Sequence, residues 1–128
     1  MKQQYPHSDI TGKIIGAAIE VHRILGPGFL ETVYEEALAR ELTRRGIPFE
    51  RQIDVPIYYK GDVVGKHRLD LLVEGCIIVE LKRVTDLAEV HFAVVLSYLN
   101  ATNLDVALLL NFAKPRMECR RITRKGAP

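Results

Sequence analysis

The stretch that decides the fold of this chain runs from His67 to Lys82 and has the sequence HRLDLLVEGCIIVELK. Two apolar runs flank a Glu-Gly-Cys segment, and this pattern predicts a β-hairpin. Each run carries charge where a strand covered on both faces should have none: Asp70 in the first run, Glu80 and Lys82 in the second. These three side chains are therefore the first candidates for a functional site.

The length of the hairpin loop decides whether these charges meet. Side chains alternate between the two faces of a strand, so Glu80 and Lys82 share one face. A loop of three or five residues places Asp70 opposite Glu80 on that face, whereas a two-residue loop separates them. With the odd loop the carboxylates lie about 5 Å apart, which costs stability unless something neutralises them. A divalent cation would do so, and hard oxygen ligands favour Mg²⁺, Mn²⁺ or Ca²⁺ over Zn²⁺.

The same charges also fit a solvated face of an antiparallel sheet. Leu72 and Ile78 share their face, which favours a face that is at least partly covered. Periodicity alone leaves both interpretations open.

Length and composition set the outer limits. The chain has 128 residues, 48% hydrophobic and 27% charged, which predicts one globular domain spanning 1–128. A net charge of +2 is too small to identify a partner. No apolar run approaches the roughly 20 residues that cross a bilayer, and the N-terminus lacks the apolar segment of a signal peptide. With only two cysteines, Cys76 and Cys119, the sequence is typical of a cytoplasmic protein with reduced thiols and no membrane partner.

The order of periodic segments predicts the architecture. Three amphipathic or apolar segments predict helices, at about Ile10–Leu25 after a Ser8 or Asp9 cap, at Leu30–Arg45 before Gly46, and from an Asp86–Glu89 capping box to Leu99. Strands are expected at Pro48–Lys60, in the hairpin, at Val106–Phe112 and at Met117–Ile122. We therefore expect an α/β sandwich around a mixed, mostly antiparallel sheet with the hairpin at its centre.

A fourth acid stands at the start of the second helix. On a helical wheel Glu31 falls between Leu38 and Leu42, inside the arc expected to be buried, where a carboxylate needs a partner. The alternative is a first-turn acid that complements the helix dipole.

Two sets of residues resemble known motifs. Asp70, a nine-residue gap and then Glu80-Leu81-Lys82 resemble the Asp…Glu-x-Lys signature of the PD-(D/E)XK nuclease superfamily. Upstream, Gly28–Tyr34 (GFLETVY) resembles the motif that names the GxxExxY family within that superfamily. The segments Glu20–Pro27 and Leu108–Phe112 are also similar to that family, so the resemblance covers about residues 10–122.

The resemblance implies a three-layer restriction-endonuclease-like fold and a Mg²⁺-dependent nuclease that hydrolyses phosphodiester bonds of DNA or RNA. Asp70, Glu80, the backbone carbonyl of Leu81 and Glu31 would hold Mg²⁺ or Mn²⁺. Lys82 would hold or deprotonate the attacking water. Asp70, Glu80, Lys82 and Glu31 are thus the expected catalytic residues.

Basic side chains suggest where a nucleic acid would lie. Arg83, Lys60, Arg120 and Arg121 are the candidates for holding its backbone. A solvated edge strand protected by charge is the alternative for the last two. A domain of this size offers little surface for substrate selection, so a homodimer is also expected.

One position departs from the family pattern. Val94 stands where related nucleases carry a glutamine that lines the site. It favours a second hypothesis, an inactive nuclease-like domain that binds nucleic acid or a protein partner. A third is a metal- or small-molecule-binding protein without a nucleic acid partner.

Overall fold

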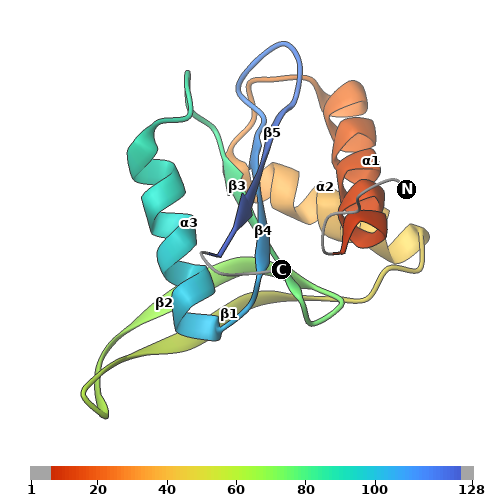
Figure 1. Ribbon diagram of the computed structural model, residues 1–128. Coiled ribbons are helices and arrows are strands. Elements are labelled where there is room, and N and C mark those ends of the chain that lie inside the picture. Colours follow the sequence, from red (N-terminus) through yellow and green to blue (C-terminus); the bar gives the residue numbers. More distant parts are fainter. Residues whose placement is uncertain (1–6, 125–128) are drawn as a thin grey trace, which may run out of the picture.

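The computed structural model describes residues 7–124, which form three helices and five strands (Figure 1). The helices are α1 (Ser8–Leu25), α2 (Glu31–Arg44) and α3 (Glu89–Thr102). The strands are β1 (Phe49–Tyr59), β2 (Asp62–Val73), β3 (Ile77–Lys82), β4 (Val106–Asn111) and β5 (Glu118–Thr123). No helix in this range is long and apolar enough to cross a membrane.

The five strands form one sheet in the order β1-β2-β3-β4-β5. Only β3 and β4 run parallel, because α3 connects them; the other neighbours are antiparallel. The β2–β3 hairpin lies at the centre of the sheet, which confirms the expected mixed, mostly antiparallel arrangement.

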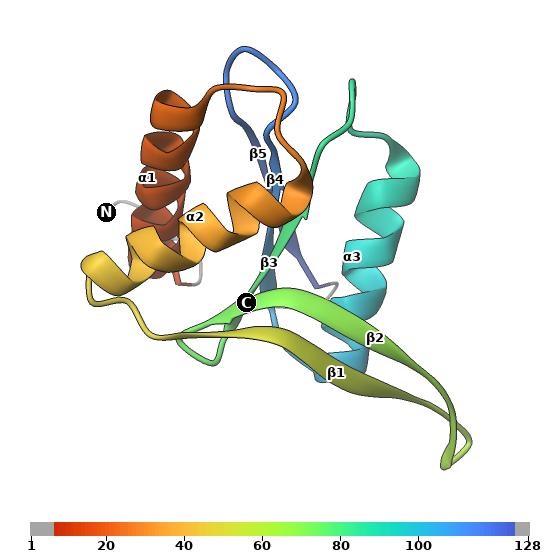
Figure 2. The same cartoon turned by 180° about the vertical axis from the view of Figure 1, so that it is seen from behind.

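Helices cover both faces of the sheet. α1 and α2 pack on one face and α3 on the other (Figures 1 and 2). All six residues of β4 are buried, as expected of a strand covered on both sides. The predicted three-layer α/β sandwich is therefore confirmed.

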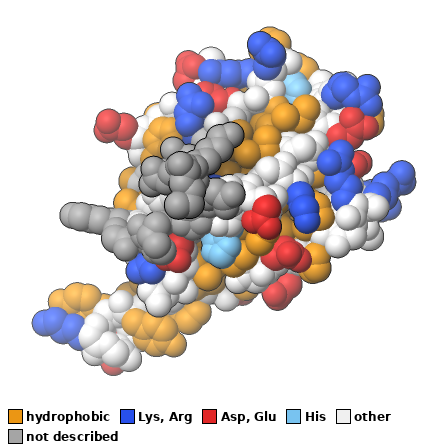
Figure 3. All heavy atoms as spheres, turned by 45° about the vertical axis from the view of Figure 1, so that its right-hand side comes forward, with side chains coloured by type: hydrophobic (Ala, Val, Ile, Leu, Met, Phe, Trp, Pro, Cys, Tyr) orange, Lys and Arg blue, Asp and Glu red, His pale blue; other side chains and the backbone are white. Residues whose placement is uncertain are grey.

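The β1–β2 pair forms a long ribbon that extends beyond the body of the molecule (Figures 1 and 2). β1 is an edge strand, as Pro56 predicted, and the register of the ribbon shifts just after it, between Ile57 and Tyr58. Hydrophobic side chains are exposed on the ribbon in Figure 3, and Tyr58, Tyr59 and Val63 near its tip are each more than 60% exposed.

Two helix starts differ from the sequence expectation. α1 already begins at Ser8 and has no side-chain cap, so neither Ser8 nor Asp9 caps it. α3 begins only at Glu89, and the Ala88 N–H is capped by Nδ1 of His91 at 2.8 Å. The expected capping box from Asp86 to Glu89 does not form: Asp86 lies before the helix and pairs with Lys114, at 3.3 Å.

α3 is also less buried than its apolar sequence predicted. Val95 and Leu99 are buried, but Val90 is 63% exposed and Val94 39%. The reason is that α3 is the only helix on its face of the sheet in the described range, so one side of it faces no neighbour.

Candidate active site

The register of the central hairpin places Asp70 opposite Glu80. The turn has three residues, and Val73, Leu72 and Leu71 pair with Ile77, Ile78 and Val79 in turn. The next pair along the hairpin is Asp70 and Glu80. The odd-length loop on which the site hypothesis depended is therefore present.

Next to Leu71 and Val79, the side-chain carboxylates of Asp70 and Glu80 accept the hydrogen bonds between β2 and β3 in place of backbone carbonyls. The N–H of Leu81 donates to Oδ2 of Asp70, and the N–H of Asp70 donates to Oε1 of Glu80, both at 2.9 Å. Each carboxylate is thus held by a backbone N–H group of the opposite strand.

The carboxylates lie in surroundings that disfavour their charge. Glu80 is 4% exposed, and its burial, followed by the charge of Asp70, raises its pKa to about 8. Burial also raises the pKa of Asp70, partly opposed by the Leu81 N–H, while the charge of Lys82 lowers the pKa of both acids. Within residues 7–124 neither acid forms an ion pair within 4 Å. The protein therefore compensates the charge of the pair only in part.

The ribbon changes layer next to this pair. In β2, Leu71 packs in the core under α1 and α2, whereas Leu69, two residues earlier, packs in the core under α3. Residues two apart share a face in a regular strand, so both strands of the ribbon turn over between them. Gln52, which lies level with Asp70 in β1, has a left-handed φ of 51°. Asp70 therefore lies at the point where β2 passes from the core under α1 and α2 to the core under α3.

Glu35 of α2 was not singled out as a site residue, yet it lies near this point. Its carboxylate accepts hydrogen bonds from Nη2 of Arg51 at 2.9 Å and from Nε2 of Gln52 at 2.6 Å. After burial and the Leu81 N–H, the charge of Glu35 has the largest effect on the pKa of Asp70, ahead of that of Glu31. The four-residue spacing from Glu31 on one helix face was its only signal in the sequence.

Glu31 is exposed in the first turn of α2 and not buried as the helical wheel predicted. It acts on Asp70 through its charge. In the described part of the chain, no three His, Cys, Asp or Glu side chains are close enough to hold a metal ion. Two carboxylates, from Asp70 and Glu80, are brought together, and Glu31 does not join them.

Two further side chains lie near the pair. Lys82 is half-buried on the face of Glu80 and close enough for its charge to act on both acids. Tyr98 comes from α3, which covers that face of the sheet: burial, then the charges of Glu80 and Asp70, raise its pKa. Tyr98 follows Val94 by four residues, so both are on one side of α3. The sequence indicated Tyr98 only as a polar-capable residue of an apolar helix.

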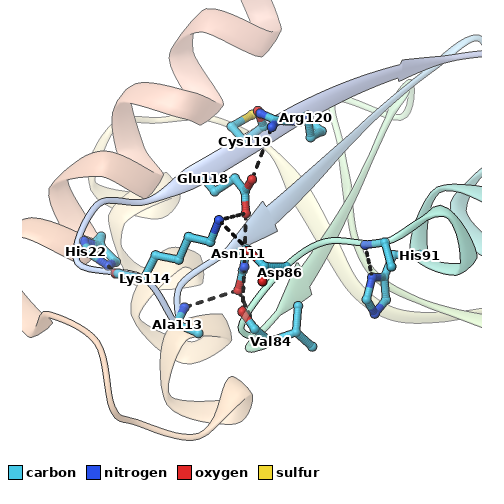
Figure 4. Close-up of polar contacts among 11 residues, drawn as sticks. His22, Val84, Asp86, His91, Asn111, Ala113, Lys114, Glu118, Cys119 and Arg120 are labelled. Carbon is cyan, nitrogen blue, oxygen red and sulfur yellow. Dashed lines mark hydrogen bonds and ion pairs between the residues drawn. The ribbon is translucent and has the colours of Figure 1, made fainter.

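A dense polar cluster holds the end of β3 just beyond Lys82 (Figure 4). Asn111, fully buried, is the parallel partner of Lys82. Its amide oxygen accepts from the N–H groups of Val84 at 3.1 Å and Ala113 at 3.2 Å, and its Nδ2 donates to the Val84 carbonyl at 2.8 Å and to Glu118 at 3.2 Å. This side chain therefore ties the segment after β3 to the β4–β5 turn.

The other family-like residues have structural roles around this cluster. Tyr34 is fully buried, stacks on Phe112 at 4.6 Å and donates its hydroxyl hydrogen to the Gly26 carbonyl at 2.6 Å, which shapes the α1–α2 loop. Nε2 of His22 contacts the Lys114 carbonyl at 2.9 Å. Gly28 in the loop has a φ of 113°, which only glycine adopts readily.

The four basic candidates do not form one patch. Arg83 is exposed directly after Lys82. Lys60 lies at the ribbon tip, eight strand residues or about 26 Å from the level of Asp70. Arg120 is level with Glu80 two strands away, about 10 Å, and pairs with Glu118, while Arg121 donates to Oγ1 of Thr11 in α1.

Comparison with known proteins places this geometry in a family context. A model of the PD-(D/E)XK nuclease superfamily matches residues 8–122. No curated protein sequence gives a significant match. Among solved structures, the crystal structure of SSO0001 superposes with a TM-score of 0.54 at 15% identity, over 94% of this chain and 80% of that one. An alkaline exonuclease from Laribacter hongkongensis gives 0.48 at 13% identity, over 94% and 72%.

Proposed function

The chain belongs to the PD-(D/E)XK nuclease superfamily, and on that premise we propose that it is a Mg²⁺- or Mn²⁺-dependent nuclease of the GxxExxY branch. It would hydrolyse phosphodiester bonds of DNA or RNA, and residues 1–128 would form a single nuclease domain. One observation carries the proposal: Asp70 and Glu80 face each other in a buried setting that raises both pKa values, with Lys82 beside them.

The donor set fits a hard divalent cation. Asp70, Glu80 and the carbonyl of Leu81 offer oxygen ligands, and Mg²⁺ keeps several waters when few protein ligands are present. Glu31 and Glu35 lie near enough for their charges to act on Asp70, so they would hold waters of the cation instead of the cation itself. When bound, such a cation polarises a phosphate oxygen and lowers the pKa of a coordinated water.

The side chains around the pair account for the remaining steps. Lys82 would orient the attacking water and offset the charge that develops on the phosphate. Glu80 would have to lose its proton first; its pKa is raised to about 8 even with the charge of Lys82 nearby, so a bound cation would be needed to stabilise the carboxylate at neutral pH. Arg83 is the basic residue next to the site, and Lys60 and Arg120 would contact more distant phosphates.

A second candidate function is binding without cleavage, to nucleic acid or to a protein. Val94 favours it, because its apolar side chain is 39% exposed on α3 and offers the site no hydrogen-bond donor.

A cleavage assay separates the two. Labelled single- and double-stranded DNA and RNA are incubated with the protein and Mg²⁺, Mn²⁺ or EDTA, beside Asp70→Ala and Lys82→Ala. We expect metal-dependent cutting that falls at least about 100-fold in both variants. Lys13→Ala, which removes the same charge from the exposed face of α1, should cut normally.

Each outcome decides something. Cutting that survives both substitutions overturns the nuclease proposal. Salt-sensitive binding without cutting, under every metal condition, supports the second candidate.

A further inference from the structure

A cavity of about 410 Å³ lies where the β1–β2 ribbon meets α3. Figures 1 and 2 show the ribbon passing beside the C-terminal half of that helix. Pro56 and Ile57 of β1 supply apolar surface, and Tyr58 also lines the cavity. His67 of β2 and the α3 residues Ser97 and Asn100 supply polar groups.

The hydrogen-bond pattern in the cavity leaves groups available for a ligand. The hydroxyl of Ser97 donates to the Val94 carbonyl at 2.5 Å, so it must accept from Nε2 of His67, 3.2 Å away. Nδ1 of His67 then carries a lone pair. Within residues 7–124 no hydrogen bond uses that nitrogen or the side-chain amide of Asn100. The cavity therefore presents one acceptor and one amide that both donates and accepts.

No charged residue lines this cavity. Burial lowers the pKa of His67 below its usual 6.5, so its imidazole is neutral at pH 7. A phosphate group would need Arg, Lys or several backbone N–H groups, which favours an uncharged ligand with donors and acceptors along its edge. A nucleobase has this chemistry, and in a duplex its pairing edge is already occupied.

The cavity adjoins the carboxylate pair. His67 precedes Asp70 by three residues of β2, or about 10 Å. Tyr98 connects the two places: its ring packs edge-on against the His67 ring with centroids 4.3 Å apart, and it also lies within the electrostatic reach of Glu80. A strand whose phosphate lies at the carboxylates would bring a nearby base to the cavity.

We propose that this cavity binds an unpaired nucleobase next to the scissile phosphate, so that the substrate is single-stranded at that point. The inference rests on the proposed nuclease function and adds the substrate class. His67 and Asn100 contact the base edge, while Pro56 and Ile57 of β1 supply apolar surface against the base.

Binding without metal tests this separately from cleavage. The probes are a fluorescent single-stranded oligonucleotide, the same backbone with all bases removed, and the matching duplex, each titrated with the full chain in EDTA. The wild-type protein should bind the intact single strand about 10-fold more tightly than the abasic backbone. Asn100→Ala and His67→Ala should lose most of that preference while keeping their affinity for the abasic backbone.

Lys66→Ala provides the matched control, because Lys66 precedes His67 on the opposite face of β2. It should weaken the intact and abasic strands equally. Asn100 is exposed, so its substitution remains informative even where His67→Ala unfolds the protein.

Three results overturn the proposal: equal affinity of the wild-type protein for the intact and abasic strands, an unchanged preference in Asn100→Ala, or binding to duplex alone. Duplex cutting with no base preference overturns this inference and leaves the nuclease function standing. A base preference that depends on Asn100, without cutting under any metal, supports this inference and overturns the nuclease function.

Discussion

Asn111 and Glu80 are buried polar side chains on neighbouring central strands, but they differ in how fully their polar atoms are hydrogen-bonded. Asn111 is fully buried, and its amide makes four hydrogen bonds that use both its oxygen and its nitrogen. Glu80 is 4% exposed and faces a second carboxylate, with one backbone N–H as its hydrogen-bond donor. Only the first arrangement is what a stable core requires.

The difference separates structure from function. A satisfied amide such as Asn111 stabilises one arrangement of the loops around β3, whereas an unbalanced pair such as Asp70 and Glu80 costs stability. Burial and like charge at one place are typical of sites that bind a ligand or perform acid–base chemistry. The following substitutions test this contrast, from the largest expected effect to the smallest.

Asn111→Ala should destabilise the protein most. It leaves the N–H groups of Val84 and Ala113 without their acceptor, which we expect to lower the free energy of unfolding by about 3 kcal/mol and the melting temperature by about 10 °C. Thermal unfolding followed by circular dichroism measures the change. The same substitution at exposed Asn100 should shift the melting temperature little. Equal shifts in the two variants would contradict the structural role of Asn111.

Glu80→Gln should have the opposite sign at alkaline pH. The pKa of Glu80 is about 8 in the folded protein and near 4.5 in the unfolded chain, so the folded state holds the extra proton between these values. The stabilising contribution of this proton is therefore fully present below pH 4.5 and is lost as the pH rises through 8. At pH 6 the amide should already be more stable than the acid by about 2 kcal/mol, and the two should converge near pH 4.5.

Denaturant unfolding at several pH values measures that slope. Glu74→Gln, in the exposed hairpin turn, should leave it unchanged. A wild-type protein whose stability rises between pH 5 and 8, with Glu80→Gln following in parallel, would show that the pair is compensated in solution.

A divalent cation should relieve the same repulsion. At about ten times its dissociation constant, Mn²⁺ should raise the free energy of unfolding by about 1.4 kcal/mol, or the melting temperature by about 5 °C. Asp70→Asn should abolish the shift, and Asp54→Asn, which changes an exposed carboxylate paired with Arg68, should retain it. A shift of equal size in both variants would place the ion elsewhere.

The smallest effect is expected at Gln52, where the ribbon changes layer. Glycine adopts a φ of 51° without the strain that a Cβ causes, so Gln52→Gly should be about 1 kcal/mol more stable than Gln52→Ala. In a regular strand glycine is the less stable of the two. Chemical denaturation of the two variants, side by side, decides whether the left-handed conformation exists in solution.

Much of the fold was predictable because local pattern determines it. Alternating and periodic apolar residues indicated all five strands and three helices, and the central hairpin brought out Asp70, Glu80 and Lys82. The helix starts were predicted less accurately: α1 has no side-chain cap, and Asp86, expected to cap α3, pairs with the distant Lys114.

The site beyond the hairpin was not predictable in the same way. Glu35 and Tyr98 come from helices on opposite faces of the sheet, and they reach the carboxylates because the ribbon switches layers at Gln52. Neither that switch nor the cavity beside His67 leaves a periodic signal.

By itself the sequence determined that Glu80 and Lys82 share one face of the hairpin. The three-residue turn, which the structure shows, decided that Asp70 lies opposite them. Tertiary structure alone decided how deeply they are buried, which helices approach them, and that Glu31 remains in solvent while Glu35 is held by Arg51. The physical reason is range: strand alternation acts between adjacent residues, whereas burial and charge–charge effects depend on every element that packs around the site.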